Sequence, residues 1–125
     1  MLDCTLKLDP NSVFTLAMRE TGSPRSGYHL ILRPKTQEAE LLSAAFSQPR
    51  RVELDTTKPI RVQAFVQGSI IEVFINDQYS LTCRAYDYEA GNLHLSVSGG
   101  TASLVALQVK VPHPTTAGMG LSARK

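Results

Sequence analysis

The sequence contains no tryptophan and only two cysteines, Cys4 and Cys83, among its 125 residues. Two cysteines are too few for a disulfide scaffold or for a zinc site of the usual ligand spacing. Both lie within alternating apolar runs, so we expect them to be small buried residues, although the sequence leaves a single bridge between them open. The cysteine content therefore excludes the disulfide-rich and zinc-binding classes of small protein.

The chain also lacks a long apolar run and a charge excess. No run approaches the ~20 residues required to cross a bilayer, and the N-terminus lacks the basic-then-apolar layout of a secretory signal. The net charge of +2 comes from Arg124 and Lys125, since residues 1–123 carry equal numbers of basic and acidic side chains. Nucleic-acid binding needs a basic patch that displaces counterions from phosphate. We therefore predict no membrane and no nucleic-acid partner, while the compartment stays undetermined.

Motifs for catalysis or for cofactor binding are absent as well. The sequence has no glycine-rich phosphate loop, dinucleotide fingerprint or G-x-S-x-G nucleophile motif. Its three histidines share no ligand spacing with each other or with cysteine, and we expect them at the surface. The local oxygen-ligand pairs, Asp9 with Asn11 and Asp87 with Glu89, are weak calcium candidates. We predict no metal and no cofactor.

What the chain does have is alternation of apolar and polar residues with a period of two. Such alternation places one face of a strand in a core and the other toward water. Clusters of proline, glycine and asparagine interrupt the runs, as expected for turns. The alternating runs cover residues 4–8, 14–18, 28–33, 60–66, 70–84, 93–97 and 105–111. This pattern predicts an all-β fold, a two-sheet antiparallel β-sandwich with roughly nine to twelve strands.

Two segments depart from the alternation. Residues 37–46 are rich in helix formers, but an isolated helix of this length is marginal in water, so we predict a strand or a strand pair there. The segment after Pro112 contains proline and glycine without periodicity. We therefore expect a single domain over residues 1–112 and a flexible C-terminal tail over residues 113–125.

The segment 67–84 predicts a β-hairpin whose register follows from burial. A three-residue loop at residues 76–78 pairs Ile75 with Tyr79, and further along Val73 with Leu81, which gives one wholly apolar face. A two-residue loop at residues 77–78 would mix apolar and polar residues on both faces. In the favoured register Glu72 lies diagonally across from Arg84, close enough for an ion pair on the polar face.

The same hairpin carries a family resemblance. Residues 69–77 (Ser-Ile-Ile-Glu-Val-Phe-Ile-Asn-Asp) resemble the S-x-x-E-V-F-x-N-D hairpin of family 32 glycoside hydrolases, the invertases, inulinases and levanases. Residues 81–86 (Leu-Thr-Cys-Arg-Ala-Tyr) are similar to that family's L-T-x-R-x-Y strand. The resemblance is strong over residues 60–111 and implies the C-terminal β-sandwich, a jelly-roll of the concanavalin A-like lectin/glucanase superfamily. The family commonly has glycine where Gln78 stands, so we expect Gln78 to adopt a positive φ.

The resemblance also indicates what is missing. In this family the catalytic residues belong to an N-terminal β-propeller and lie in W-M-N-D-P-N-G-like, R-D-P and E-C motifs. None of these motifs occurs in this chain. The resemblance therefore implies a non-catalytic accessory domain that supports a fructan- or sucrose-type glycoside hydrolase, with a catalytic propeller and a fructan or another glycan as partners.

A free-standing, lectin-like carbohydrate-binding module is the alternative. A sugar site requires an exposed aromatic ring and convergent polar groups, because the C–H faces of sugars stack on rings. The candidate binding residues are Glu72, Asn76, Arg84, Tyr86, Asp87 and Tyr88. The two tyrosines have an ordinary interpretation as half-buried loop residues. An exposed apolar patch would indicate a missing partner surface, whereas a fully polar surface would indicate an independent domain.

Overall fold

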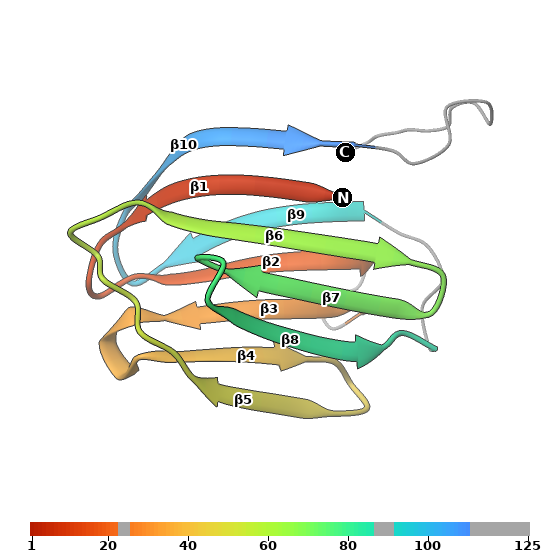
Figure 1. Ribbon diagram of the computed structural model, residues 1–125. Coiled ribbons are helices and arrows are strands. Elements are labelled where there is room, and N and C mark those ends of the chain that lie inside the picture. Colours follow the sequence, from red (N-terminus) through yellow and green to blue (C-terminus); the bar gives the residue numbers. More distant parts are fainter. Residues whose placement is uncertain (23–25, 87–91, 111–125) are drawn as a thin grey trace.

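The computed structural model describes residues 1–22, 26–86 and 92–110 of the chain. Two five-stranded antiparallel sheets lie face to face (Figure 1). Sheet A has the strand order β10-β1-β6-β7-β8, and sheet B has the order β5-β4-β3-β2-β9. The strands are β1 (Leu2–Leu8), β2 (Val13–Glu20), β3 (Tyr28–Arg33), β4 (Glu38–Leu42), β5 (Ser47–Arg51), β6 (Ile60–Gln67), β7 (Ile70–Ile75), β8 (Tyr79–Arg84), β9 (Asn92–Ser98) and β10 (Ala102–Val109). The prediction of an antiparallel β-sandwich is confirmed.

The core forms from the alternating apolar positions. In β1, Leu2, Cys4, Leu6 and Leu8 are buried, while the residues between them are more exposed. Burial of aliphatic side chains from both sheets is the main stabilising contribution in such a sandwich. Cys4 and Cys83 are both buried free thiols, as expected. The described residues contain no helix that is long and apolar enough to cross a membrane.

The segment rich in helix formers is extended. A short 3₁₀ helix (Pro34–Thr36) precedes β4, and β4 and β5 pair as a hairpin. Gln37 adopts the left-handed conformation with φ of 54°. Its side-chain amide donates to the Leu54 carbonyl at 3.0 Å and accepts from the Leu54 N–H at 2.8 Å. Cross-strand pairing with β3 overrides the local helix propensity. Of the two alternatives for residues 37–46, the single strand is confirmed, because β5 begins only at Ser47.

The β7–β8 hairpin has the predicted register, with Val73 opposite Leu81 and Ile75 opposite Tyr79. The expectation for Gln78 is wrong: Asn76 and Asp77 have the positive φ values, both 54°. Asn76 forms two hydrogen bonds with Arg61 on β6, in which its N–H donates to the Arg61 carbonyl and its side-chain oxygen accepts from the Arg61 N–H. Asparagine and aspartate tolerate this conformation better than most residues, which explains its position in the loop.

The last strand departs from the expected pattern. A register shift opposite Thr5 and Leu6 leaves Val105 without a partner on β1. The residues opposite buried β1 side chains are therefore Ala102, Leu104, Leu107 and Val109. Val105 is not among them, so the predicted alternation of residues 105–111 is wrong at that position. The predicted domain end at residue 112 and the tail over residues 113–125 lie outside the described residues.

Candidate functional site

The outward face of the β7–β8 hairpin carries three of the predicted binding residues. Along β8 and its extension, Leu81, Cys83 and Ala85 are buried, whereas Thr82, Arg84 and Tyr86 are exposed. Successive side chains of a strand point to opposite faces, so the exposed three share the outer face of sheet A. The register places Glu72 of β7 directly opposite Thr82 and diagonal to Arg84. We call Glu72, Thr82, Arg84 and Tyr86 the hairpin patch.

Glu72 and Arg84 do not form the expected ion pair. Neither side chain makes a salt bridge or a hydrogen bond with any other described residue. Glu72 is half-buried and lies opposite Phe65 of β6, whose ring packs edge-on against Phe74 at a centroid distance of 5.8 Å. The patch therefore presents a carboxylate and a guanidinium with unused hydrogen-bonding capacity beside apolar rings. Such a combination suits a ligand that has both hydroxyl groups and C–H faces.

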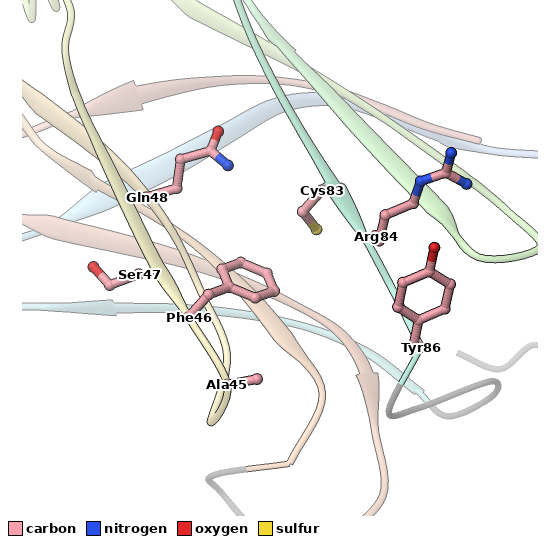
Figure 2. A pocket seen from close by; sticks show the side chains of 7 residues that line it. All are labelled: Ala45, Phe46, Ser47, Gln48, Cys83, Arg84 and Tyr86. Atoms are coloured by element: carbon pink, nitrogen blue, oxygen red, sulfur yellow. The ribbon is translucent and has the colours of Figure 1, made fainter.

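An open hollow of about 510 Å³ adjoins the patch at the edge of the sandwich. Figure 2 shows Arg84 and Tyr86 of the hairpin on one side and the β4–β5 connection with Phe46 on the other. The Tyr86 side chain is exposed, with a relative accessibility of 70% for the residue. The wall is completed by Ala45, Ser47, Gln48 and Cys83. The hollow thus has a ring, a cation and an amide around an opening wide enough for a small ligand.

Next to the hollow, the edge strands of the two sheets are connected by side chains. Gln48 of β5 donates from its amide nitrogen to the Thr82 carbonyl at 3.2 Å, and Arg50 donates to the Ser80 carbonyl at 2.7 Å. The Arg50 guanidinium also lies 5.4 Å from the centroid of the Tyr79 ring. These contacts satisfy backbone carbonyls of β8 that no further strand pairs. They fix β8 over β5, and so position Arg84 and Tyr86.

The remaining predicted residues are placed differently. Ile70 pairs with Arg84 at one end of β7, and Asn76 lies at the other end. The hydrogen bonds that Asn76 forms with Arg61 give it a structural role in the loop. A strand of this length spans roughly 16 Å, so Asn76 does not join the hairpin patch. Asp87 and Tyr88 follow Tyr86 directly but lie outside the described residues.

Arg19 is a nearby residue that the sequence reasoning missed. It lies where the pairing of β2 with β9 shifts register, it has a φ of 57°, and it donates to the Gly68 carbonyl in the β6–β7 turn at 2.6 Å. Its positive charge partly offsets the effect of burial, which raises the pKa of the Cys83 thiol to about 11. Cys83 is therefore a neutral wall of the hollow rather than a nucleophile. An arginine at the end of an otherwise apolar run was the only signal in the sequence.

No cluster of three or more potential metal ligands occurs in the described parts of the chain. Asp9, one half of a weak calcium pair, has an ordinary structural role, because its carboxylate accepts the Asn11 N–H at 2.8 Å. The other pair, Asp87 with Glu89, lies in the undescribed segment. His29 and His94 both lie 3.6 Å from the carboxylate of Glu20 on sheet B.

Comparison with solved structures defines the class of fold. The carbohydrate-binding module CBM66 from Bacillus subtilis aligns over 82% of this chain and 69% of its own, with a TM-score of 0.68 and 12% identity. An ancestral congerin, Con-anc, aligns over 86% of this chain and 87% of its own, with a TM-score of 0.63 and 16% identity. A double mutant of congerin II has the same TM-score at 13% identity, over 87% and 89% of the two chains. The fold is a lectin-like β-sandwich.

The family is defined by sequence. The model described as "Glycosyl hydrolases family 32 C terminal" matches residues 17–111. This chain therefore belongs to the family of C-terminal domains of glycosyl hydrolases family 32, as the hairpin motif indicated. No protein with a curated description matches it.

Proposed function

We propose that this chain is a non-catalytic accessory β-sandwich of a fructan- or sucrose-type glycoside hydrolase, and that its hairpin patch contacts glycan. Family membership supports the accessory role. The observation that carries the glycan contact is the exposed Tyr86 ring beside an unpaired Arg84 at the hollow, with an unpaired Glu72 diagonal to Arg84 on the same face. Unused charged groups next to an exposed ring bind hydroxyl groups while the ring packs against C–H groups.

Levan, inulin and short fructo-oligosaccharides are the ligands to test, by calorimetric titration of the whole chain. Saturable binding is expected. Tyr86→Ala is expected to weaken it about ten-fold or more, a loss of roughly 1.4 kcal/mol, whereas Tyr86→Phe retains the ring and most of the affinity. Glu72→Gln keeps the shape and removes the charge, so it tests whether the carboxylate accepts sugar hydroxyls.

Arg51→Gln is the matched control for Arg84→Gln. Both arginines are exposed on edge strands at the same side of the sandwich. Arg84 lines the hollow together with Tyr86, whereas Arg51 does not line it. Weaker binding after Arg84→Gln but not after Arg51→Gln supports the site. Absence of heat changes up to millimolar sugar, or equal effects of both substitutions, would contradict the glycan contact and leave the supporting role alone.

A free-standing carbohydrate-binding module is the second candidate. The fold of this chain is also found in the carbohydrate-binding module CBM66. Against it stands an apolar edge formed by β9 and β10, where Leu104, Leu107 and Val109 are about half exposed. An exposed apolar area of this kind indicates contact with another protein surface. It favours a role within an assembly over a solitary module.

A further inference from the structure

The hollow beside Tyr86 has a charged side chain of one sign only in its wall, the guanidinium of Arg84. No aspartate or glutamate belongs to this wall, which is completed by Ala45, Phe46, Ser47, Gln48 and Cys83. Arg84 makes no hydrogen bond or salt bridge with any other described residue. A guanidinium without a partner, in an opening that no carboxylate lines, favours a ligand group with negative charge.

The surroundings of the hollow add further positive charge. Arg19 donates to the Gly68 carbonyl at 2.6 Å, and its charge reaches the Cys83 thiol in the wall, where it works against the larger effect of burial on the pKa. Strands β5 and β8, which form this edge of the sandwich, contain three arginines and neither aspartate nor glutamate. The edge is therefore basic, although residues 1–123 carry equal numbers of acidic and basic side chains.

Two carboxylates lie next to residues of the wall, and neither neutralises Arg84. Glu40 accepts a hydrogen bond from the Ser47 hydroxyl at 2.5 Å and pairs with Arg33 at 2.9 Å, so its charge is already balanced. Glu72 lies diagonal to Arg84 on the outer face of sheet A, but it does not line the hollow and forms no salt bridge with Arg84. The position against the Arg84 guanidinium is thus left for a ligand.

Aromatic rings stand on both sides of the opening. Phe46 is held in place by Tyr28, on which its ring stacks at a centroid distance of 6.2 Å. Figure 2 shows Phe46 across the hollow from Tyr86 and Arg84. Rings pack well against the C–H face of a sugar, and a volume of about 510 Å³ is within the usual range for small-ligand sites. The hollow therefore combines apolar walls with one cation.

We propose that the hollow selects a glycan residue that carries a carboxylate, a hexuronic acid, whose carboxylate binds Arg84 while its C–H face packs on Tyr86. This inference rests on the proposed glycan contact and names the class of glycan. The guanidinium fork matches a carboxylate with two parallel hydrogen bonds, and such charge-assisted bonds are about twice as strong as those to a neutral hydroxyl. Gln48 spends its amide nitrogen on the Thr82 carbonyl, so its amide oxygen is left to accept from a sugar hydroxyl.

Calorimetric titration of the whole chain with digalacturonate and with its dimethyl ester tests the proposal. The two ligands have the same sugar rings, and the ester lacks only the charges. The acid is expected to bind at least about ten-fold more tightly than the ester at low ionic strength, because only the acid forms charge-assisted bonds. Added salt is expected to reduce this preference by weakening binding of the acid and not of the ester.

Substitutions of Arg84 identify the group that reads the charge. Arg84→Gln is expected to lower the ratio of the two affinities to about one, and Arg84→Lys, which keeps the charge without the fork, to give an intermediate ratio. Arg51→Gln is the matched control, because it removes the same charge from the same edge but from a residue that does not line the hollow. It is expected to keep the full preference. Circular dichroism checks that each variant is folded.

Equal affinities of the wild-type chain for the acid and the ester overturn the proposal, and so does a preference that survives Arg84→Gln. The failure of this inference is distinguishable from failure of the proposed function. A chain that binds fructo-oligosaccharides, loses them on Tyr86→Ala and shows no preference for the acid keeps the glycan contact and loses the hexuronic acid. A chain that binds none of these sugars loses both.

Discussion

The two flanks of this sandwich end the same two sheets in opposite ways. At the edge formed by β5 and β8, the closed flank, the two strands are held together by Gln48 and Arg50, and the inward-facing Leu81 is only 2% exposed. At the edge formed by β9 and β10, the open flank, Leu107 lies opposite the buried Cys4 and therefore faces inward, yet it is 46% exposed. Inward orientation is thus set by strand pairing, whereas burial requires something to cover the edge. Four measurements sharpen or break this contrast.

Truncation of the two edge leucines has the largest expected effect. Leu81→Ala removes a buried side chain and leaves a cavity, so it is expected to lower the free energy of unfolding by about 2–5 kcal/mol. Leu107→Ala removes a side chain already in contact with water and is expected to cost under about 1 kcal/mol. Urea unfolding at dilute protein concentration measures both. Equal losses would show that the open flank is not open in solution.

Removal of Arg50 comes next in size. Arg50→Ala removes the hydrogen bond to the Ser80 carbonyl and the contact with the Tyr79 ring, and is expected to cost about 1 kcal/mol. Arg51→Ala is the control, expected within about 0.5 kcal/mol of wild type. Amide exchange of β8 after Arg50→Ala shows whether the edge itself loosens. A stability unchanged from wild type would mean that the side chain does not close the flank.

The acid sensitivity of the β4–β5 pair is a smaller effect. The hydrogen bond from Ser47, together with Arg33, lowers the pKa of Glu40 from its ordinary 4.5. A lowered pKa in the folded state means that the stabilisation is present above pH 4.5 and is lost as the pH falls through the folded-state value. Glu40→Gln is therefore expected to be less stable than wild type near neutral pH and to lose less stability on acidification. Parallel pH profiles of the two proteins would contradict this assignment.

Thiol labelling detects the smallest difference. Burial raises the pKa of Cys4 and of Cys83 to about 11, so both thiols are expected to react slowly in the folded protein. Cys4 lies on β1 beside the edge strand β10 and is fully buried, whereas Cys83 is 9% exposed and lines the hollow at the opposite edge of the sandwich. Cys83 is therefore expected to be labelled first. Peptide mapping of the labelled chain decides the order, and earlier labelling of Cys4 would show that local opening of β10 outweighs the accessibility of Cys83 in the folded state.

Much of the fold and one part of the site follow from the sequence, for identifiable reasons. A one-residue slip of the hairpin would place Val73 opposite Thr82, so burial allowed only the observed register. The same register put Glu72 diagonal to Arg84, and Tyr86 two residues beyond Arg84 on the same face. The absence of an ion pair between Glu72 and Arg84 could not be predicted from the sequence, because cross-strand proximity does not determine which way a long side chain extends. The same register also puts Asn76 in the loop, at the far end of the hairpin from Arg84, and the structure confirms that separation.

The sequence by itself determined which residues face inward, since a period of two and paired turns assign the face of nearly every strand. It also determined the family, through the spacing of glutamate, asparagine, arginine and tyrosine along one hairpin. Only the tertiary structure decided which edges are covered. The bonds from Gln48 and Arg50 to carbonyls 34 and 30 residues away depend on the stacking of the two sheets, and the shift that removes Val105 from the ladder depends on pairing between the first and last strands of sheet A. No local pattern encodes such contacts, because the free energy of covering an edge is set by distant strands.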